Sequence, residues 1–263
     1  MESKTQKIGR LRSFNLFMGG LHFAQALFIL FLARNTEAPR TVTSSYLAPA
    51  EGSVGNEVNL EVFTRDLFTV NFVWFSVGFL LLSATFHLLI STVYYKKYSS
   101  DLQKGMNRMR WFEYSLSASW MMVAIMMLAG NFDFGVLLSI FVLTAIMNLM
   151  GYIMEVHNQT TKETNWSSYW IGVLAAVVPW IVIGLQLWSS ETSSNGDVPT
   201  FVYGIFFSIF LFFNCFAINM VLQYKEVGKW SDYLYGERVY IILSLVAKSA
   251  LAWQIYAGTL QPA

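Results

Sequence analysis

The sequence carries little charge and a single cysteine. Charged residues make up 13% of its 263 residues, whereas an average globular protein has about 25%. Cys215 has no second cysteine to pair with, so no disulfide framework or redox motif is expected. There is no Gly-x-Ser-x-Gly element, no zinc-ligand spacing, no glycine-rich phosphate loop and no basic stripe. We therefore expect neither an enzyme nor a nucleic-acid-binding protein.

Hydrophobic residues dominate instead. They make up 55% of the chain, and the mean hydropathy is +0.47. Six long runs contain no charged residue, and a seventh, 239–263, is interrupted only by Lys248. Each run can cross a hydrocarbon core of about 30 Å, which takes about 20 helical residues. The sequence predicts an all-α membrane protein, a single seven-transmembrane-helix bundle with approximate spans at 11–34, 67–94, 108–130, 134–157, 167–189, 199–224 and 236–258.

The positive charges indicate the orientation of the bundle. Thirteen Lys and Arg residues lie in or beside the N-terminal segment and the second, fourth and sixth connections, whereas the other side has only Arg34, Arg40 and Arg65. Positively charged loops stay in the cytoplasm. We therefore expect a multi-pass protein of the cell membrane with a cytoplasmic N-terminus and an extracellular C-terminus.

The long first outer connection, 35–66, has a pattern of its own. A stretch at 41–47 is followed by a turn rich in Pro, Gly and Ser. In 57–63, apolar residues then alternate with polar ones, which is the period of a half-buried strand. We predict an extracellular β-hairpin over the outer mouth of the bundle, useful as a lid or a subunit contact. A disordered loop is the alternative.

One charged residue lies deep inside a span. Lys248 is about ten residues from the cytoplasmic flank of the last span, or roughly 15 Å deep at about 1.5 Å per residue. A cation there costs at least about 2.5–3.5 kcal/mol, so it must face the bundle interior and have a partner or a modification. Its neighbours Ala247, Ser249, Ala250 and Ala252 are small and leave room for a group attached through an imine. A structural lysine paired with a carboxylate, or one lining a transport path, is an equal alternative.

Glu113 is the candidate partner of Lys248. It is the first acidic residue inside the third span, and it lies in the same cytoplasmic half as the lysine. A carboxylate about 4 Å from a protonated imine would hold the proton on the imine. The alternative is an interfacial ion pair with Arg110, one turn earlier on the same helix. Glu155, at the cytoplasmic end of the fourth span, reads as a solvated helix terminus.

Two histidines lie at a matching depth. His22 in the first span and His87 in the second are both about ten residues or fewer from their cytoplasmic ends. Such a pair beside a carboxylate favours a hydrated proton-accepting site over isolated packing histidines. Ser83 lies one turn from His87, and Ser244 one turn from Lys248.

Seven helices, an interior lysine in the last and a carboxylate in the third together resemble a retinal-binding rhodopsin. Several segments are similar in detail to the heliorhodopsins, and the resemblance extends through all seven spans. The strongest is Ser244-Leu-Val-Ala-Lys-Ser-Ala-Leu-Ala-Trp-Gln254. The others are Leu21-His22, Phe86-His87-Leu88, Arg110-Trp-Phe-Glu-Tyr-Ser-Leu-Ser117, Val178-Pro-Trp180, Phe201-Val-Tyr-Gly204, Phe210-Leu-Phe-Phe-Asn214, Gly228-Lys-Trp-Ser231 and Gly236-Glu-Arg238.

The resemblance implies a chromophore site. Lys248 would carry all-trans retinal as a protonated Schiff base, with Glu113 as its counterion. It also implies a homodimer, with the first outer loop folded as a β-hairpin. The proton-accepting polar network would comprise His22, His87, Ser83, Ser244, Ser117 and Arg110. The retinal pocket would be lined by Tyr114, Met147, Gly151, Pro179, Trp180, Phe210, Phe213 and Trp253.

Two functions are open within this fold. Light-driven isomerisation would send the proton from Lys248 toward the histidine cavity and change helix packing, as in a light sensor with an unidentified cytoplasmic partner. A light-driven proton or ion transporter is the alternative. Ordinary microbial pumps have an aspartate where this chain has Ser244, and the third span continues beyond Glu113 without a further acid. We therefore favour sensing without net pumping. A retinal-free receptor or transporter would need Lys248 to be merely structural.

Overall fold

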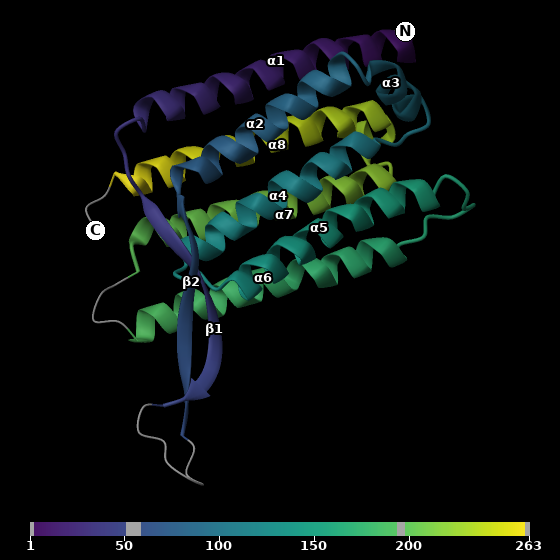
Figure 1. The fold of residues 1–263 in the computed structure, drawn as a ribbon. Helices are drawn as coiled ribbons and strands as arrows, with labels where there is room; N and C mark the ends of the chain where they lie inside the picture. The colour runs from purple at the N-terminus through teal and green to yellow at the C-terminus, as the bar shows by residue number, and fades with distance from the viewer. Residues whose placement is uncertain (1–2, 51–58, 194–197, 261–263) are drawn as a thin grey trace.

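The computed structural model describes residues 3–50, 59–193 and 198–260. Long helices lie side by side in one bundle (Figure 1). A short helix, α3 (Tyr95–Gln103), and a 3₁₀ turn, η1 (Gly228–Ser231), lie in connections and were not predicted. The seven long helices are α1 (Lys4–Leu32), α2 (Val73–Ser91), α4 (Arg108–Leu128), α5 (Phe134–His157), α6 (Ser167–Ser193), α7 (Thr200–Tyr224) and α8 (Tyr233–Thr259).

Six of these helices, all except α4, are long and apolar enough to cross a membrane. The exception carries Arg110, Glu113 and three buried serines. It packs against α2 and α5 within the bundle (Figure 1). Because its neighbours cover it, these polar side chains do not have to face lipid. With its 21 residues, α4 completes the predicted seven-helix bundle.

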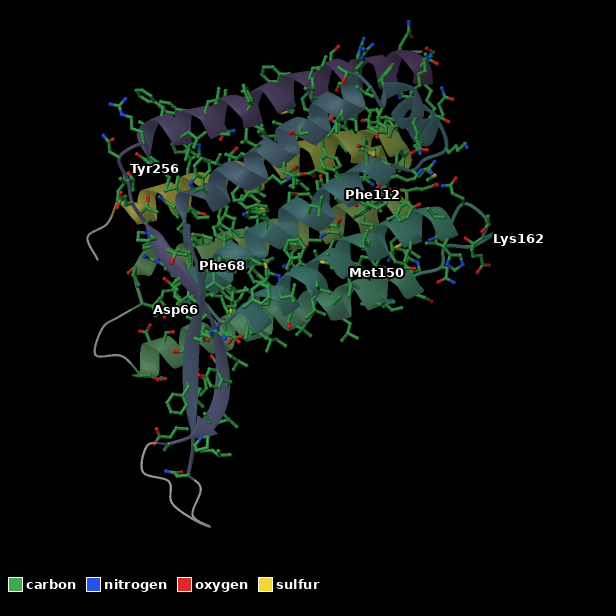
Figure 2. All side chains as sticks on the ribbon, viewed as in Figure 1. Asp66, Phe68, Phe112, Met150, Lys162 and Tyr256 are labelled. Atoms are coloured by element: carbon green, nitrogen blue, oxygen red, sulfur yellow. The ribbon has the colours of Figure 1, made fainter. Side chains whose placement is uncertain are left out.

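The outer faces of the helices are apolar, as side chains around the bundle show (Figure 2). Phe17, Phe31, Trp188 and Leu211 are all exposed on the surface of the chain. A helix that is hydrophobic nearly all round is typical of a membrane span, since lipid replaces water around it. The interior instead contains a methionine-rich core along α4, around residues 121–127.

The first connection folds as an antiparallel β-hairpin, as predicted. Strand β1 (Pro39–Pro49) pairs with β2 (Leu60–Asn71), and an irregularity in register lies between Val42 and Thr43. The strands extend further than the sequence predicted, because 64–71 pairs with 39–45 and so satisfies its backbone in the ladder. The second span therefore begins at Val73 and not at 67. Of the predicted strand 57–63, residues 57–58 lie outside the described part of the chain.

The strand predicted from the alternating pattern is confirmed, but the prediction that one of its faces is half-buried is wrong. Val62 is 70% exposed and Leu47 is 64% exposed. The hairpin runs across one end of the bundle, and its far part projects beyond α6 (Figure 1). Few neighbours cover these apolar side chains, since the contacts of the hairpin with the bundle lie near α5 and around Val42 and Val70, away from Leu47 and Val62.

Asp133 ties the hairpin to the bundle. Its Oδ2 accepts a hydrogen bond from the Ser45 N–H at 2.8 Å, and its Oδ1 accepts from the Gly135 N–H at 2.9 Å, which caps α5. Thr43 N–H also donates to the Phe132 carbonyl at 2.9 Å. Slight burial opposes ionisation of Asp133, but these backbone donors lower its pKa below the ordinary value.

The two ends of the bundle differ. The N-terminus and α3 lie at one end, whereas the hairpin and the end of α8 lie at the other (Figure 1). Two helices also begin earlier than predicted. The first begins at Lys4, where Ser3 and Gln6 form a capping box, and α8 begins at Tyr233, where Asp232 accepts a hydrogen bond from the Leu234 N–H.

Candidate functional site

Lys248 and Glu113 form a buried ion pair in the bundle interior. The distance from Lys248 Nζ to Glu113 Oε1 is 2.7 Å, and the side chains are 4% and 8% exposed. Ser83 of α2 donates to the same carboxylate oxygen at 2.6 Å, and Lys248 also donates to Ser244 Oγ at 2.8 Å. The expected partnership is therefore observed, and four polar groups from α2, α4 and α8 meet at one point.

The two predicted histidines lie next to this ion pair, on α1 and α2. The rings of His22 and His87 stack with centroids 5.6 Å apart. His87 Nδ1 lies 2.8 Å from Asn15 Oδ1, whereas both ring nitrogens of His22 are buried without a hydrogen-bond partner among the described residues. The helices can approach because Gly19 faces His87: a Cβ there would lie 2.9 Å from the Cβ of His87.

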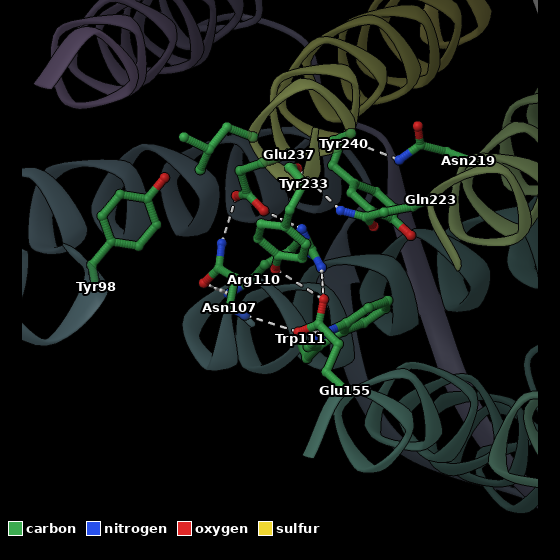
Figure 3. Close-up of polar contacts among 12 residues, drawn as sticks. Tyr98, Asn107, Arg110, Trp111, Glu155, Asn219, Gln223, Tyr233, Glu237 and Tyr240 are labelled. Carbon is green, nitrogen blue, oxygen red and sulfur yellow. Dashed lines mark hydrogen bonds and ion pairs between the residues drawn. The ribbon is translucent and has the colours of Figure 1, made fainter. Parts of the chain in front are cut away.

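Arg110 was predicted in the same network. It lines a small cavity together with His87 and Glu113, but its ion pairs form a separate cluster. Its guanidinium pairs with Glu155 and Glu237, and not with Glu113 (Figure 3). The predicted solvated position of Glu155 is also wrong, because its side chain is only 2% exposed. The cluster forms where the starts of α4 and α8 meet the end of α5. These helix ends cover one another, although the sequence predicts that helix ends are exposed to solvent.

A cavity of about 610 Å³ opens on the other side of Lys248. It is bounded by α4, α5, α6, α7 and α8, and its wall is mostly apolar and aromatic. Ligand cavities in proteins typically measure about 300–1,000 Å³. Ser117 lies on this wall, and its hydroxyl has no hydrogen-bond partner in the described part of the chain, so it is not in the ion-pair network where the sequence placed it.

Most of the predicted pocket residues do line this cavity, and two do not. Trp253 points away, since its Nε1 donates to Gln25 Oε1 of α1 at 3.0 Å. Pro179 is buried in α6 but is not on the wall. The predicted residues that do line it are Tyr114, Met147, Gly151, Trp180, Phe210 and Phe213. Wall residues that the sequence did not identify include Trp111, Met121, Phe206 and Tyr240.

Gly151 shapes the cavity wall by making room for an indole ring. A Cβ at this position would lie 2.4 Å from Cζ3 of Trp111. Trp111 is held in place because its Nε1 donates to Glu155 Oε2 at 2.7 Å. The indole therefore lines the cavity with its ring and joins the Arg110 cluster with its nitrogen. An apolar group attached at Lys248 Nζ fits this arrangement, with a counterion on one side and aromatic walls on the other.

Comparisons with known proteins agree with this geometry. A family model described as Heliorhodopsin matches residues 11–260. Among solved structures, the chain is similar to a light-driven proton pump, LR (Mac), from Leptosphaeria maculans, with a TM-score of 0.53 and 10% identity. That alignment covers 98% of this chain and 94% of the pump. At this identity the likeness shows the fold alone. A search of curated protein sequences gives no significant match.

Proposed function

Because the chain belongs to the heliorhodopsin family and is thus a rhodopsin with a retinal chromophore, we propose that Lys248 carries all-trans retinal covalently at Nζ. One observation carries this proposal. Lys248 Nζ lies between the carboxylate of Glu113, at 2.7 Å, and the apolar cavity of about 610 Å³. A lysine that is only structural would explain the ion pair, but not the aromatic cavity beside it.

Retinal, when bound, supplies absorption of visible light and a light-driven change of shape. The chain supplies the electrostatics. Glu113 holds a proton at Lys248 Nζ, and Ser83 and Ser244 orient the two groups. Trp180, Phe210 and the other aromatic residues of the wall exclude water, which strengthens this charge pairing.

Sensing is the function that the cavity supports best. No acidic residue is among the described residues that line the large cavity, so the wall offers no carboxylate to carry a proton away from the ion pair on that side. The histidines and the Arg110 cluster instead lie on the side of α3 and the N-terminus. The charge change at Lys248 would therefore act on helix packing at that end of the bundle.

The proposed orientation places this end in the cytoplasm. The N-terminal segment, α3 and the connections near residues 162 and 229 carry most of the Lys and Arg residues, in accord with the positive-inside rule. A signalling partner would then dock in the cytoplasm. The exposed apolar side chains of the hairpin, among them Leu47 and Val62, would serve as a contact between two copies in a homodimer outside the cell.

The test is the absorption of the purified chain after addition of all-trans retinal. We expect a visible band that hydroxylamine bleaches, that Lys248→Ala abolishes, and that Lys162→Ala, at an exposed lysine, leaves unchanged. Glu113→Gln should shift the band to longer wavelength. If Lys248→Ala kept the band, the attachment site would be wrong. A light-driven pH change in intact cells that a protonophore abolishes would favour transport over sensing.

A further inference from the structure

The Arg110 cluster carries more negative than positive charge. Arg110, Glu155 and Glu237 are only 3%, 2% and 1% exposed, and the guanidinium lies between the two carboxylates (Figure 3). The other groups around them are neutral: Asn107 of α4, Tyr98 of α3, and Tyr233 and Tyr240 of α8. With both carboxylates ionised the cluster has a net charge of −1. A buried, uncompensated charge is costly, so this site favours uptake of one proton.

The two carboxylates are not equally satisfied. Glu155 accepts hydrogen bonds from Arg110, the Asn107 N–H at 2.8 Å, Trp111 Nε1 at 2.7 Å and Tyr233 Oη at 3.0 Å. Among the residues that the structure describes, Glu237 accepts only from Arg110 and from Asn107 Nδ2 at 2.6 Å. A carboxylate has about four acceptor positions. The acceptor positions of Glu155 are therefore filled, whereas Glu237 has a position left for a proton.

A small cavity lies between Glu237 and two hydrogen-bond partners of Lys248, Glu113 and Ser244. Lys248 itself is not among the described residues that line it. The volume of this cavity is about 30 Å³, comparable to the share of one water molecule in the liquid. Its wall includes Glu113, His87, Ser244 and Glu237, whereas Glu155 does not line it. Along α8, residues 237, 241, 244 and 248 recur at spacings of four, three and four, so they lie on one face of the helix. The path from Lys248 Nζ to Glu237 would therefore pass first to Ser244 or Glu113 and then through this cavity.

We propose that Glu237 is a proton-accepting carboxylate that receives, through this small cavity, the proton released from Lys248 Nζ. The inference rests on the proposed function and extends the path beyond the histidines. The N–H bond at Lys248 breaks, an O–H bond forms at Glu237, and the nitrogen keeps its electron pair. Lys248 goes from +1 to neutral and the cluster from −1 to neutral, while Glu113 stays ionised. Total charge is conserved, and no co-reactant is required.

Infrared difference spectroscopy of the full chain with retinal tests this assignment. Illumination should produce the carbonyl absorption of a newly protonated carboxyl group. Glu237→Gln should remove that band, whereas Glu163→Gln, at an exposed glutamate, should keep it. Glu237→Asp keeps a carboxyl group and should shift the band without removing it. A band that persists in Glu237→Gln would assign the proton to Glu113, and no carboxyl band in the unchanged chain would assign it to the histidines. Either result overturns the proposal.

A second measurement needs no retinal. An infrared pH titration of the retinal-free chain should show protonation of one buried carboxyl group that Glu237→Gln abolishes and Glu163→Gln, at an exposed glutamate, leaves unchanged. An unchanged titration in Glu237→Gln would refute the assignment. Failure of the proposed function looks different, because then retinal would give no visible band in any variant while the titration would still report on Glu237.

Discussion

The Lys248–Glu113 ion pair predicts that removing one partner costs more than removing both. We consider Glu113→Gln, Lys248→Met and the double variant in the retinal-free chain, where Nζ is an ammonium group. The pair is buried, so neither charge can turn to water when its partner is lost. Ser83 can still donate to the side chain at position 113 in every variant, whereas Ser244 loses the hydrogen bond from Lys248 in Lys248→Met and in the double variant.

The magnitude follows from the distance and the burial. At 2.7 Å and an effective dielectric constant of about 20, the attraction is about 6 kcal/mol. Burial of the two ions costs several kcal/mol each, so the pair contributes little net stability. Loss of one partner leaves the other charge uncompensated, which costs about 3–5 kcal/mol. Loss of both removes that penalty, and the double variant should be more stable than either single variant.

The assay is the free energy of unfolding of each purified variant in detergent, combined as a double-mutant cycle. A matched control exists in the connection between α5 and α6, where Lys162 and Glu163 are adjacent and exposed. Lys162→Met and Glu163→Gln should each change stability by less than about 0.5 kcal/mol and should add. If Glu113→Gln and Lys248→Met were also additive, the two side chains would not form a coupled buried pair.

Two further predictions concern packing and pH. Gly151→Ala should destabilise the chain by about 1–3 kcal/mol, since the added Cβ would lie 2.4 Å from the ring of Trp111. Gly20→Ala is the control, because a Cβ at that position would have no described neighbour within 4 Å apart from its own stretch of helix. Equal melting temperatures for the two variants would contradict the close approach at Gly151. Asp133→Ala should cost about 1 kcal/mol through loss of the α5 cap and should increase hydrogen exchange at Ser45. Because the pKa of Asp133 is lowered, its contribution is complete above about pH 4 and is lost as pH falls through its folded value. The quantity to compare is the protection factor of the Ser45 N–H, which is the exchange rate of an unstructured amide at the same pH divided by the observed rate. An unchanged protection factor between neutral and acid pH would refute that link.

The sequence was sufficient to predict the Lys248–Glu113 ion pair because this chain has few charged residues. Lys248 interrupts an otherwise apolar run, and Glu113 is the acid nearest its depth, so few partners were available. Helical spacing then placed Ser244 one turn from Lys248, as observed. Because charged residues are scarce, the long apolar runs between them also predicted the seven helices, since each run is long enough to cross the membrane.

Spacing along single helices could not predict how the helices face one another. Trp253 has the composition of a pocket residue, but its ring turns toward α1 and Gln25. Glu155 and Arg110 both lie near helix ends, where solvation is the ordinary outcome, and only tertiary packing buries them. The hairpin shows the same limit. Alternation predicted its strands, whereas the exposure of Val62 depends on how few neighbours the hairpin has.

The buried charges on α4 and α8 are arranged so that partners cannot exchange. The first helix carries Arg110 before Glu113, and the second carries Glu237 before Lys248. Exchange would place Arg110 against Lys248 and Glu113 against Glu237, and both contacts would be repulsive. Each ion pair is therefore fixed, and the small cavity is lined by Glu113 of one pair and by Arg110 and Glu237 of the other. When Lys248 loses its proton, Glu113 and His87 lie nearer to it than Glu237 does. The Arg110 cluster differs from them because it already holds a surplus negative charge that the proton can neutralise.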